Sequence, residues 1–86
     1  MRPRLHAHAA TQIAVRGATE AEVIDAVETG ETAPARYART QFRKTFSFNG
    51  EWAGKRYTTK TVEAYAVNEN GWLVITVLVK FGGRVR

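Results

Sequence analysis

The sequence contains no cysteine and only two prolines among its 86 residues. The absence of cysteine excludes disulfides and thiolate zinc ligands, and it fits a reducing compartment such as the cytoplasm. No apolar run approaches the roughly 20 residues that a membrane span requires, and none follows the amino-terminal arginines. We therefore expect neither a membrane span nor a secretory signal. A chain this short predicts a single domain over residues 1–86, ordered from about residue 4 to residue 81.

Several familiar catalytic motifs are also missing. The chain has no phosphate-cradling glycine loop, no nucleophile elbow and no pair of carboxylates spaced as in glycosidases. His6 and His8 would point about 200° apart on a helix, and further ligands are not evident, so we expect no metal site and no cofactor. Any catalysis would have to come from His8, from hydroxyl groups and from basic side chains.

Charge is segregated along the chain. Five acidic residues and no basic residue lie between Glu20 and Glu31, whereas seven basic residues and one acid lie between Arg36 and Lys60. The formal net charge is +5 and the pI is about 10.1. The basic segment favours a polyanion such as RNA or DNA as a partner, although surplus lysine and arginine also keep small proteins soluble. The acidic segment suits a solvated surface or the docking of a basic partner.

The first third of the chain predicts two helices. Leu5–Arg16 is free of glycine and proline, and Gly17 is placed to end it with a left-handed cap. Thr19 and Glu22 form the pattern of a capping box, and Gly30 ends the second helix. The apolar residues that would face the core recur at helical spacing: Leu5, Ala9, Ile13, Val23, Ile24 and Val27.

After Pro34 the period changes to alternation, which predicts strands. We expect strands around 41–48, 57–67 and 72–81, a turn over 49–54, a hairpin at 68–71 and a frayed tail at 82–86. A fourth strand would form if residues 32–38 pair. The predicted fold class is α+β, with two amino-terminal helices packed on one face of a three- to four-stranded antiparallel sheet. The strand residues expected in the core are Phe46, Val62, Ala64, Ile75, Val77 and Val79; Arg43, Tyr65 and Thr76 would lie on the open face.

Two groups of residues suggest a phosphate site. His8 and Arg16 share one ridge of the first helix, with backbones about 12 Å apart. Lys44 and Lys60 fall on the inward phase of their strands, where a lysine must reach solvent, meet a carboxylate or line a cleft. A cleft lined by Lys44 and Lys60 beside His8 and Arg16 would bind phosphate, and we expect His8, Arg16 and Lys60 to converge at the rim of the sheet. The alternatives are local capping by His8, an ion pair of Arg16 and lysines that extend to solvent at the sheet edge.

Basic and aromatic residues interleave in the predicted sheet, a composition that contacts phosphates and stacks on bases. They are Arg36, Tyr37, Arg39, Arg43, Lys55, Arg56 and Tyr57. Many sheets that bind nothing have a similar surface.

The ordered set of motifs resembles a prokaryotic family of short proteins of unknown function, over about residues 8–81. The motifs are His8, Arg16-Gly17, Glu22-Val23, Gly30, Phe42-Arg43-Lys44, Phe46, Gly54-Lys55, Tyr57, Lys60-Thr61-Val62 and Val74-Ile75-Thr76-Val77. That family is similar in pattern to RelE-like and BrnT-like toxins of toxin–antitoxin systems. The resemblance implies a RelE-like fold, RNA cleavage and an antitoxin as partner.

We therefore expect a metal-independent endoribonuclease in the cytoplasm, with RNA as substrate and a cognate antitoxin as a second partner. The predicted catalytic residues are His8, Lys60 and Tyr57. The predicted substrate-binding residues are Arg16, Arg39, Arg43, Lys44, Lys55 and Arg56. A non-catalytic RNA- or protein-binding module is the alternative, and a structural subunit that docks a partner through its acidic helix is a third.

Overall fold

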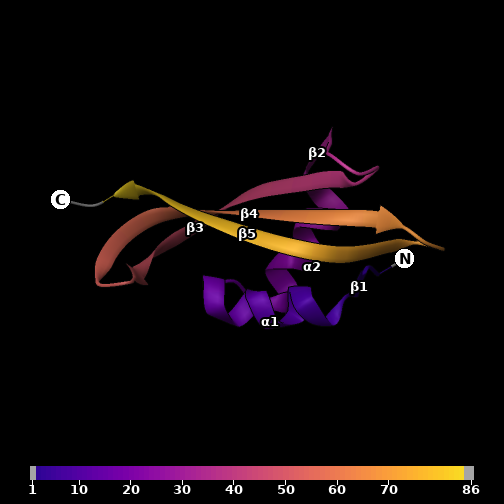
Figure 1. The fold of residues 1–86 in the computed structure, drawn as a ribbon. Helices are drawn as coiled ribbons and strands as arrows, with labels where there is room; N and C mark the ends of the chain where they lie inside the picture. Colours follow the sequence, from indigo (N-terminus) through magenta and orange to yellow (C-terminus); the bar gives the residue numbers. More distant parts are fainter. Residues whose placement is uncertain (1, 85–86) are drawn as a thin grey trace.

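The structure is a computed structural model that describes residues 2–84. Two helices cover one face of a five-stranded mixed sheet, so the α+β prediction is confirmed (Figure 1). Strand order is β1-β5-β4-β3-β2, and every neighbouring pair is antiparallel except β1 and β5. The elements are β1 (Arg4–Leu5), α1 (Ala7–Arg16), α2 (Glu20–Thr29), β2 (Glu31–Pro34), β3 (Thr40–Trp52), β4 (Lys55–Asn68) and β5 (Trp72–Arg84).

The sheet has one strand more than the largest number expected. Residues 31–34 pair with β3 as the fourth strand, and Arg4–Leu5 adds a short parallel strand beside β5. Leu5 therefore lies in β1 rather than in the first helix, which begins at Ala7. The cause is local: the His6 amide donates to the Val74 carbonyl at 2.9 Å, and His6 Nδ1 accepts from the His8 amide at 3.1 Å. His6 thus continues the pairing and caps α1.

The predicted helix boundaries at Gly17 and Thr19 are confirmed. Gly17 adopts φ 82° and its amide donates to the last carbonyls of α1. The Thr19 hydroxyl accepts from the Glu22 amide at 3.2 Å, while Glu22 accepts from the Thr19 amide at 2.9 Å. A β-carbon at position 17 would also lie 2.8 Å from the indole ring of Trp52, so glycine is required there for space as well as for its backbone conformation.

The core lies between the helices and the sheet, as the alternation predicted for most positions. Its members are Ala9, Ile13, Val23, Ala26, Val27, Phe42, Val62, Ala64, Ala66, Val74 and Val77. Ile75 was predicted there, but it is half-buried and Val74 is fully buried. The reason is a register shift: Tyr65 pairs with Thr76, whereas Ala66 pairs with Val74. Ile75 is therefore the extra residue of a β-bulge. The residues of β5 before it face the side of the sheet opposite to the one that simple alternation predicts.

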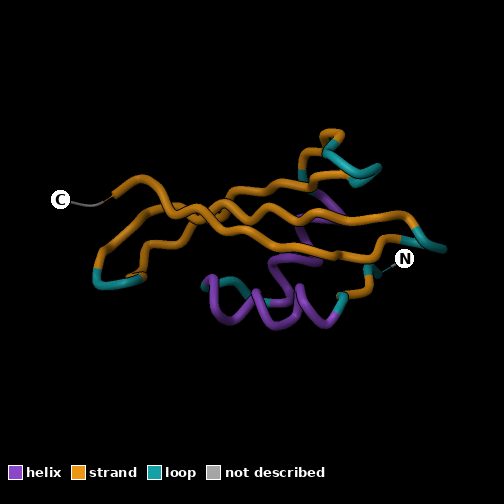
Figure 2. The backbone as a smooth tube through the Cα atoms, viewed as in Figure 1, coloured by secondary structure: helices purple, strands orange, loops and turns teal. Residues whose placement is uncertain are grey.

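The three long strands extend beyond the helices as a ribbon, and the molecule measures 44 × 23 × 23 Å (Figure 2). The predicted turn at 49–54 shrinks to Ala53-Gly54, with φ 53° and 79°. β5 continues to Arg84, so the part of the predicted frayed tail at 82–84 is strand. Residues 85–86 of that tail lie outside the described residues. Over residues 2–84, no helix is both long enough and apolar enough to cross a membrane.

Candidate nucleic-acid interface

The sheet face opposite the helices carries mostly polar side chains, as the alternation predicted. Register places Gln41, Tyr65 and Thr76 in one row across β3, β4 and β5. Arg43, Glu63 and Leu78 form the next row. We call this surface the free face. Its position away from both helices leaves it available to a ligand.

The loop between β2 and β3 has an unusual backbone. Tyr37 and Ala38 both have positive φ, 61° and 57°. The left-handed conformation costs a residue with a β-carbon roughly 1–2 kcal/mol. Hydrogen bonds hold the loop closed: the Ala35 amide donates to the Arg39 carbonyl at 2.9 Å, and the Arg39 amide donates to the Arg36 carbonyl at 3.3 Å. Tyr37 is 82% exposed.

This loop and the free face together form a shallow pocket of about 310 Å³, which we call the tyrosine–arginine pocket. The Arg39 guanidinium lies 5.9 Å from the centre of the Tyr37 ring, within cation–π range. Tyr65 forms part of the pocket wall and is fixed there by Gln41, whose amide donates to the tyrosine hydroxyl at 3.0 Å. The lining is Ala35, Arg36, Tyr37, Arg39, Tyr65, Thr76 and Leu78.

A buried carboxylate lies beside the pocket. Glu63 is only 4% exposed although it is on the free face. Its two oxygens lie 3.5 Å from the Lys80 amine and 3.4 Å from the Tyr65 hydroxyl. Arg43 is its neighbour across the strand pair. Glu63 thus forms a network with groups that donate hydrogen bonds, beside a pocket that contains two arginines.

The two inward lysines bind carboxylates of α2. The Lys44 amine lies 2.8 Å from Asp25 and 2.7 Å from the Thr29 hydroxyl. The hydrogen bonds from Lys44 and Thr29 lower the pKa of Asp25 below its usual value. The Lys60 amine lies 2.8 Å from Glu22 and 3.1 Å from the Gly17 carbonyl. Neither amine is free to line an open phosphate cleft. Of the three possibilities for an inward lysine, both Lys44 and Lys60 therefore show the second, contact with a carboxylate.

The predicted cleft that joins His8, Arg16 and Lys60 does not form. Lys60 contacts Gly17 at the carboxyl end of α1, whereas His8 lies in its first turn, about 13 Å of helix away. His8 and Arg16 are both exposed. Tyr57 instead packs against Phe81, with ring centres 5.5 Å apart.

The remaining predicted substrate-binding residues lie in two places. Arg39 and Arg43 are on or beside the free face, and Arg43 contacts Glu31 at 3.4 Å. Lys55 and Arg56 are exposed at the tip of the β3–β4 hairpin. The structure therefore brings only Arg39 and Arg43 near one site. Their roles in binding, and the catalytic roles of His8, Lys60 and Tyr57, stay predictions.

Sequence reasoning missed Glu63 as a site residue; it named Tyr37 in the basic–aromatic group and placed Tyr65 on the open face, but included neither among the predicted substrate-binding residues. A signal for Glu63 was present, because it is the only acid within an otherwise uncharged stretch of β4, Thr61–Asn68. Its burial depends on neighbours across two strands and has no signature in the local sequence.

Among residues 2–84, no group of three or more histidine, cysteine, aspartate or glutamate side chains is placed to hold a metal ion. Comparisons with protein-family models, with curated proteins and with solved structures find no match to this chain. The resemblance to RelE-like and BrnT-like toxins therefore stays a prediction.

Proposed function

We propose that the chain binds single-stranded RNA on the free face, with the tyrosine–arginine pocket as its centre. The observation that carries the proposal is the exposed Tyr37 ring, held by a strained loop beside Arg39 and above the free face. Proteins recognise single-stranded RNA by stacking bases on aromatic or arginine side chains and by contacting phosphates with cations. Both kinds of group line this pocket.

The charge around the pocket also supports an anionic ligand. Arg36 and Arg39 form no ion pair within 4 Å among the described residues. None of the described residues that line the pocket is an acid, and the nearby Glu63 contacts Lys80. A phosphate that approaches the two arginines therefore meets no competing carboxylate in the pocket wall.

Binding of a labelled 12-nucleotide oligouridine, followed by fluorescence anisotropy, tests the proposal. Replacing Tyr37 by alanine should weaken binding by about 5- to 150-fold, since stacking contributes roughly 1–3 kcal/mol per base. Arg39→Ala should reduce the slope of log affinity against log salt by about 0.7. Val15→Ala is the matched control, because Val15 is also highly exposed but lies on α1. Equal binding by Tyr37→Ala and Val15→Ala would refute the proposal.

A second candidate is the predicted metal-independent endoribonuclease of a RelE-like toxin, acting in the cytoplasm and neutralised by a cognate antitoxin. Two features favour it: the order of two helices followed by a mostly antiparallel sheet, and the Glu63 network beside the pocket. In this proposal the exposed Lys80 side chain moves off Glu63, which then accepts the ribose 2′-hydroxyl proton while the 2′-oxygen bonds to phosphorus. The 5′-oxygen then leaves with a proton from Lys80, and Arg43 stabilises the phosphorane.

Overproduction in a bacterial host tests this second function. Wild type should arrest growth and leave RNA fragments that end in 2′,3′-cyclic phosphate, and Glu63→Gln should abolish both effects. His8→Ala should retain them, because His8 lies on the helix side and away from this network. Toxicity that is lost in His8→Ala and kept in Glu63→Gln would restore the catalytic site predicted from sequence. Harmless overproduction of a folded protein would favour the binding function alone.

A further inference from the structure

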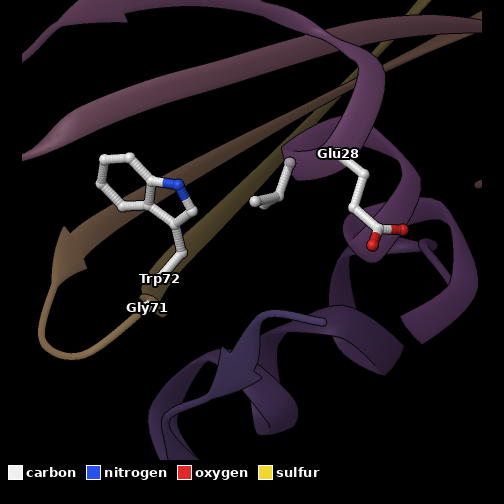
Figure 3. Close-up of a pocket in the computed structure, with 4 residues that line it drawn as sticks. Glu28, Gly71 and Trp72 are labelled. Atoms are coloured by element: carbon white, nitrogen blue, oxygen red, sulfur yellow. The ribbon is translucent and has the colours of Figure 1, made fainter. Parts of the chain in front are cut away.

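The first residues of β5 are covered by other parts of the chain. Leu73 and Val74 pair with β1 along the outer edge of the sheet. Trp72 lines a pocket of about 470 Å³ at the carboxyl end of α2, and its ring packs edge-to-face on Phe42 at a centroid distance of 4.9 Å (Figure 3). The Glu28 carboxylate, on the α2 side of this pocket, points away from the indole. The start of β5 is therefore held by contacts within the chain.

Helix α1 covers the next part of the outer edge of β5. The His6 amide donates to the Val74 carbonyl at 2.9 Å, and the Val77 amide donates to the Gln12 side chain at 2.9 Å. The helix lies alongside β5, and the strand continues past the end of the helix (Figure 1). Arg16, one helical turn after Gln12, is exposed, and residues 2–84 show no hydrogen bond from it to β5. The cover of this edge therefore ends after Val77.

The backbone of β5 beyond Val77 has unpaired groups on its outer edge. The Val77 amide points outward, toward Gln12, and the register with β4 is unbroken from Thr76 to Phe81. Alternate residues of a strand direct their N–H and C=O groups to the same edge, so those of Val79 and Phe81 also point outward. Within the described part of the chain, no strand or side chain pairs with them. Edge groups of this kind can receive a further strand.

The other sheet edges carry features that usually prevent strand addition. The opposite edge strand, β2, has four residues and ends in Pro34. β3 extends beyond its pairing with β2 at Arg43, but a register shift between Ser47 and Gly50 interrupts it. Over residues 76–82, β5 has no proline and no register shift. The end of β5 is therefore the edge best suited to receive a strand.

The elements that border this edge are basic. Neither α1 nor β5 contains an acid. Arg16 follows Gln12 by about 6 Å along α1, and Val79 follows Val77 by about 7 Å along β5, so Arg16 lies near the level of Val79. The Arg16 side chain is exposed and forms no ion pair among the described residues. Its charge is therefore available to a segment that pairs with the edge.

A second cation lies on the same part of β5. The Lys80 side chain is 71% exposed, and its amine lies 3.5 Å from Glu63 on the free face. Pairing with a second copy of β5 would place two basic strands side by side, and like charges across a strand pair are destabilising. An acidic strand would instead bring opposite charge to Arg16 and Lys80. Charge complementarity therefore favours an acidic partner over a second copy.

We propose that the outer edge of β5, around Val79 and Phe81, receives an extended acidic segment of a partner protein as an additional strand. Hydrogen bonds to the two outward backbones supply affinity, and acidic side chains that contact Arg16 and Lys80 supply specificity. The site lies at the edge of the sheet rather than in the tyrosine–arginine pocket, and it does not depend on the proposed RNA function.

Amide hydrogen exchange, followed by nuclear magnetic resonance on the full chain, tests the edge. Without ligand, the amides of Val79 and Phe81 should exchange about tenfold or more faster than those of Leu78 and Lys80, which point toward β4. The probe is acetyl-Thr-Val-Glu-Val-Glu-Val-Thr-amide. At millimolar concentration it should shift the Val79 and Phe81 amide resonances saturably and slow their exchange.

Two results would overturn the proposal at this stage. The first is an unchanged exchange rate and chemical shift of the Val79 and Phe81 amides at saturating peptide. The second is equal protection of all four amides without peptide, because the edge would then already be covered. A dimeric mass in sedimentation would identify a second copy as the cover.

A charge control and two variants test the assignment to an acidic partner. The same peptide with glutamine in place of glutamate should bind about threefold or more weakly, and Arg16→Gln should weaken the glutamate peptide by about two- to fivefold. Arg36→Gln is the matched control, because Arg36 is also exposed and unpaired among the described residues but lines the tyrosine–arginine pocket. Equal affinity for the two peptides would overturn the assignment to an acidic segment. Equal binding by Arg16→Gln and Arg36→Gln would exclude Arg16 as a contact.

Discussion

The ion pair of Lys60 and Glu22 predicts a large loss of stability when only one partner is changed. The Lys60 side chain is 7% exposed and the Glu22 side chain 20%, and their charged atoms lie 2.8 Å apart. Glu22→Gln keeps the shape of the capping side chain but removes the countercharge of the buried ammonium, which keeps only neutral neighbours such as the Gly17 carbonyl and the Phe48 ring. Removing one member of a buried pair typically costs about 3–5 kcal/mol. That loss is a large share of the roughly 5–15 kcal/mol that stabilise a small domain.

Urea unfolding at neutral pH, followed by circular dichroism, measures the effect. Adding Lys60→Met to Glu22→Gln should recover most of the lost stability, because an apolar chain of similar length replaces the stranded charge. Glu20→Gln serves as the control: Glu20 is 64% exposed and its contact with Arg2 is 3.9 Å, so its loss should cost less than about 0.5 kcal/mol. The reasoning fails if Glu22→Gln costs less than about 1 kcal/mol, since Lys60 would then reach solvent without its partner.

Three further predictions concern the acid sensitivity and the packing of the fold. Because Lys44 lowers the pKa of Asp25 in the folded state, its stabilising effect is present above about pH 4 and is lost as the pH falls. The urea midpoint of Asp25→Asn should therefore fall less than that of wild type between pH 6 and pH 3. Gly17→Ala should destabilise more than Gly54→Ala by thermal unfolding: both have positive φ, but only at position 17 would the new methyl meet an indole ring. Val74→Ala should cost about 2 kcal/mol in urea unfolding, because Val74 is fully buried. Ile75→Ala should cost less, because Ile75 is only half-buried.

The helices could be predicted from sequence because their signals are local. The capping pattern at Thr19 and Glu22 and the glycine at 17 each act within four residues of the backbone they control. The start of α1 was placed two residues early, because the pairing of Leu5 with Val74 joins segments that are far apart in sequence. A strand of two residues has no pattern of its own.

The strands were predictable in kind but not in phase. Alternation identified all three long strands and gave the correct facing of β4. It failed at Ile75, where one inserted residue shifts the register, and at residues 49–52, where β3 continues after a register shift between Ser47 and Gly50. No turn or glycine marks the bulge at Ile75 in the sequence. The wrong assignment of Ile75 to the core followed from the register shift between β4 and β5.

The candidate site was predictable only as a composition. The interleaved arginines and tyrosines pointed to nucleic acid, but the pocket depends on two consecutive left-handed residues, Tyr37 and Ala38. Neither tyrosine nor alanine is a residue type that favours that conformation, so the sequence contains no signal for the loop. The prediction of a phosphate cleft around Lys60 was wrong. The alternation of a strand shows that a lysine points inward, but it does not show which group the amine contacts there.

The segregation of charge now has a physical explanation. Acids of α2 face the inward lysines of β3 and β4, so part of the negative segment neutralises part of the positive one inside the fold. Several exposed charges take no part in the ion pairs of the described residues, among them Arg16, Lys55 and Arg56. Arg36 and Arg39 also take no part in these pairs and line the tyrosine–arginine pocket, and Glu28 lies in the last turn of α2 on the helix side. Pairing within the fold leaves the net charge of +5 unchanged and places it on the unpaired cations, so an anionic ligand is attracted to the surfaces that carry them.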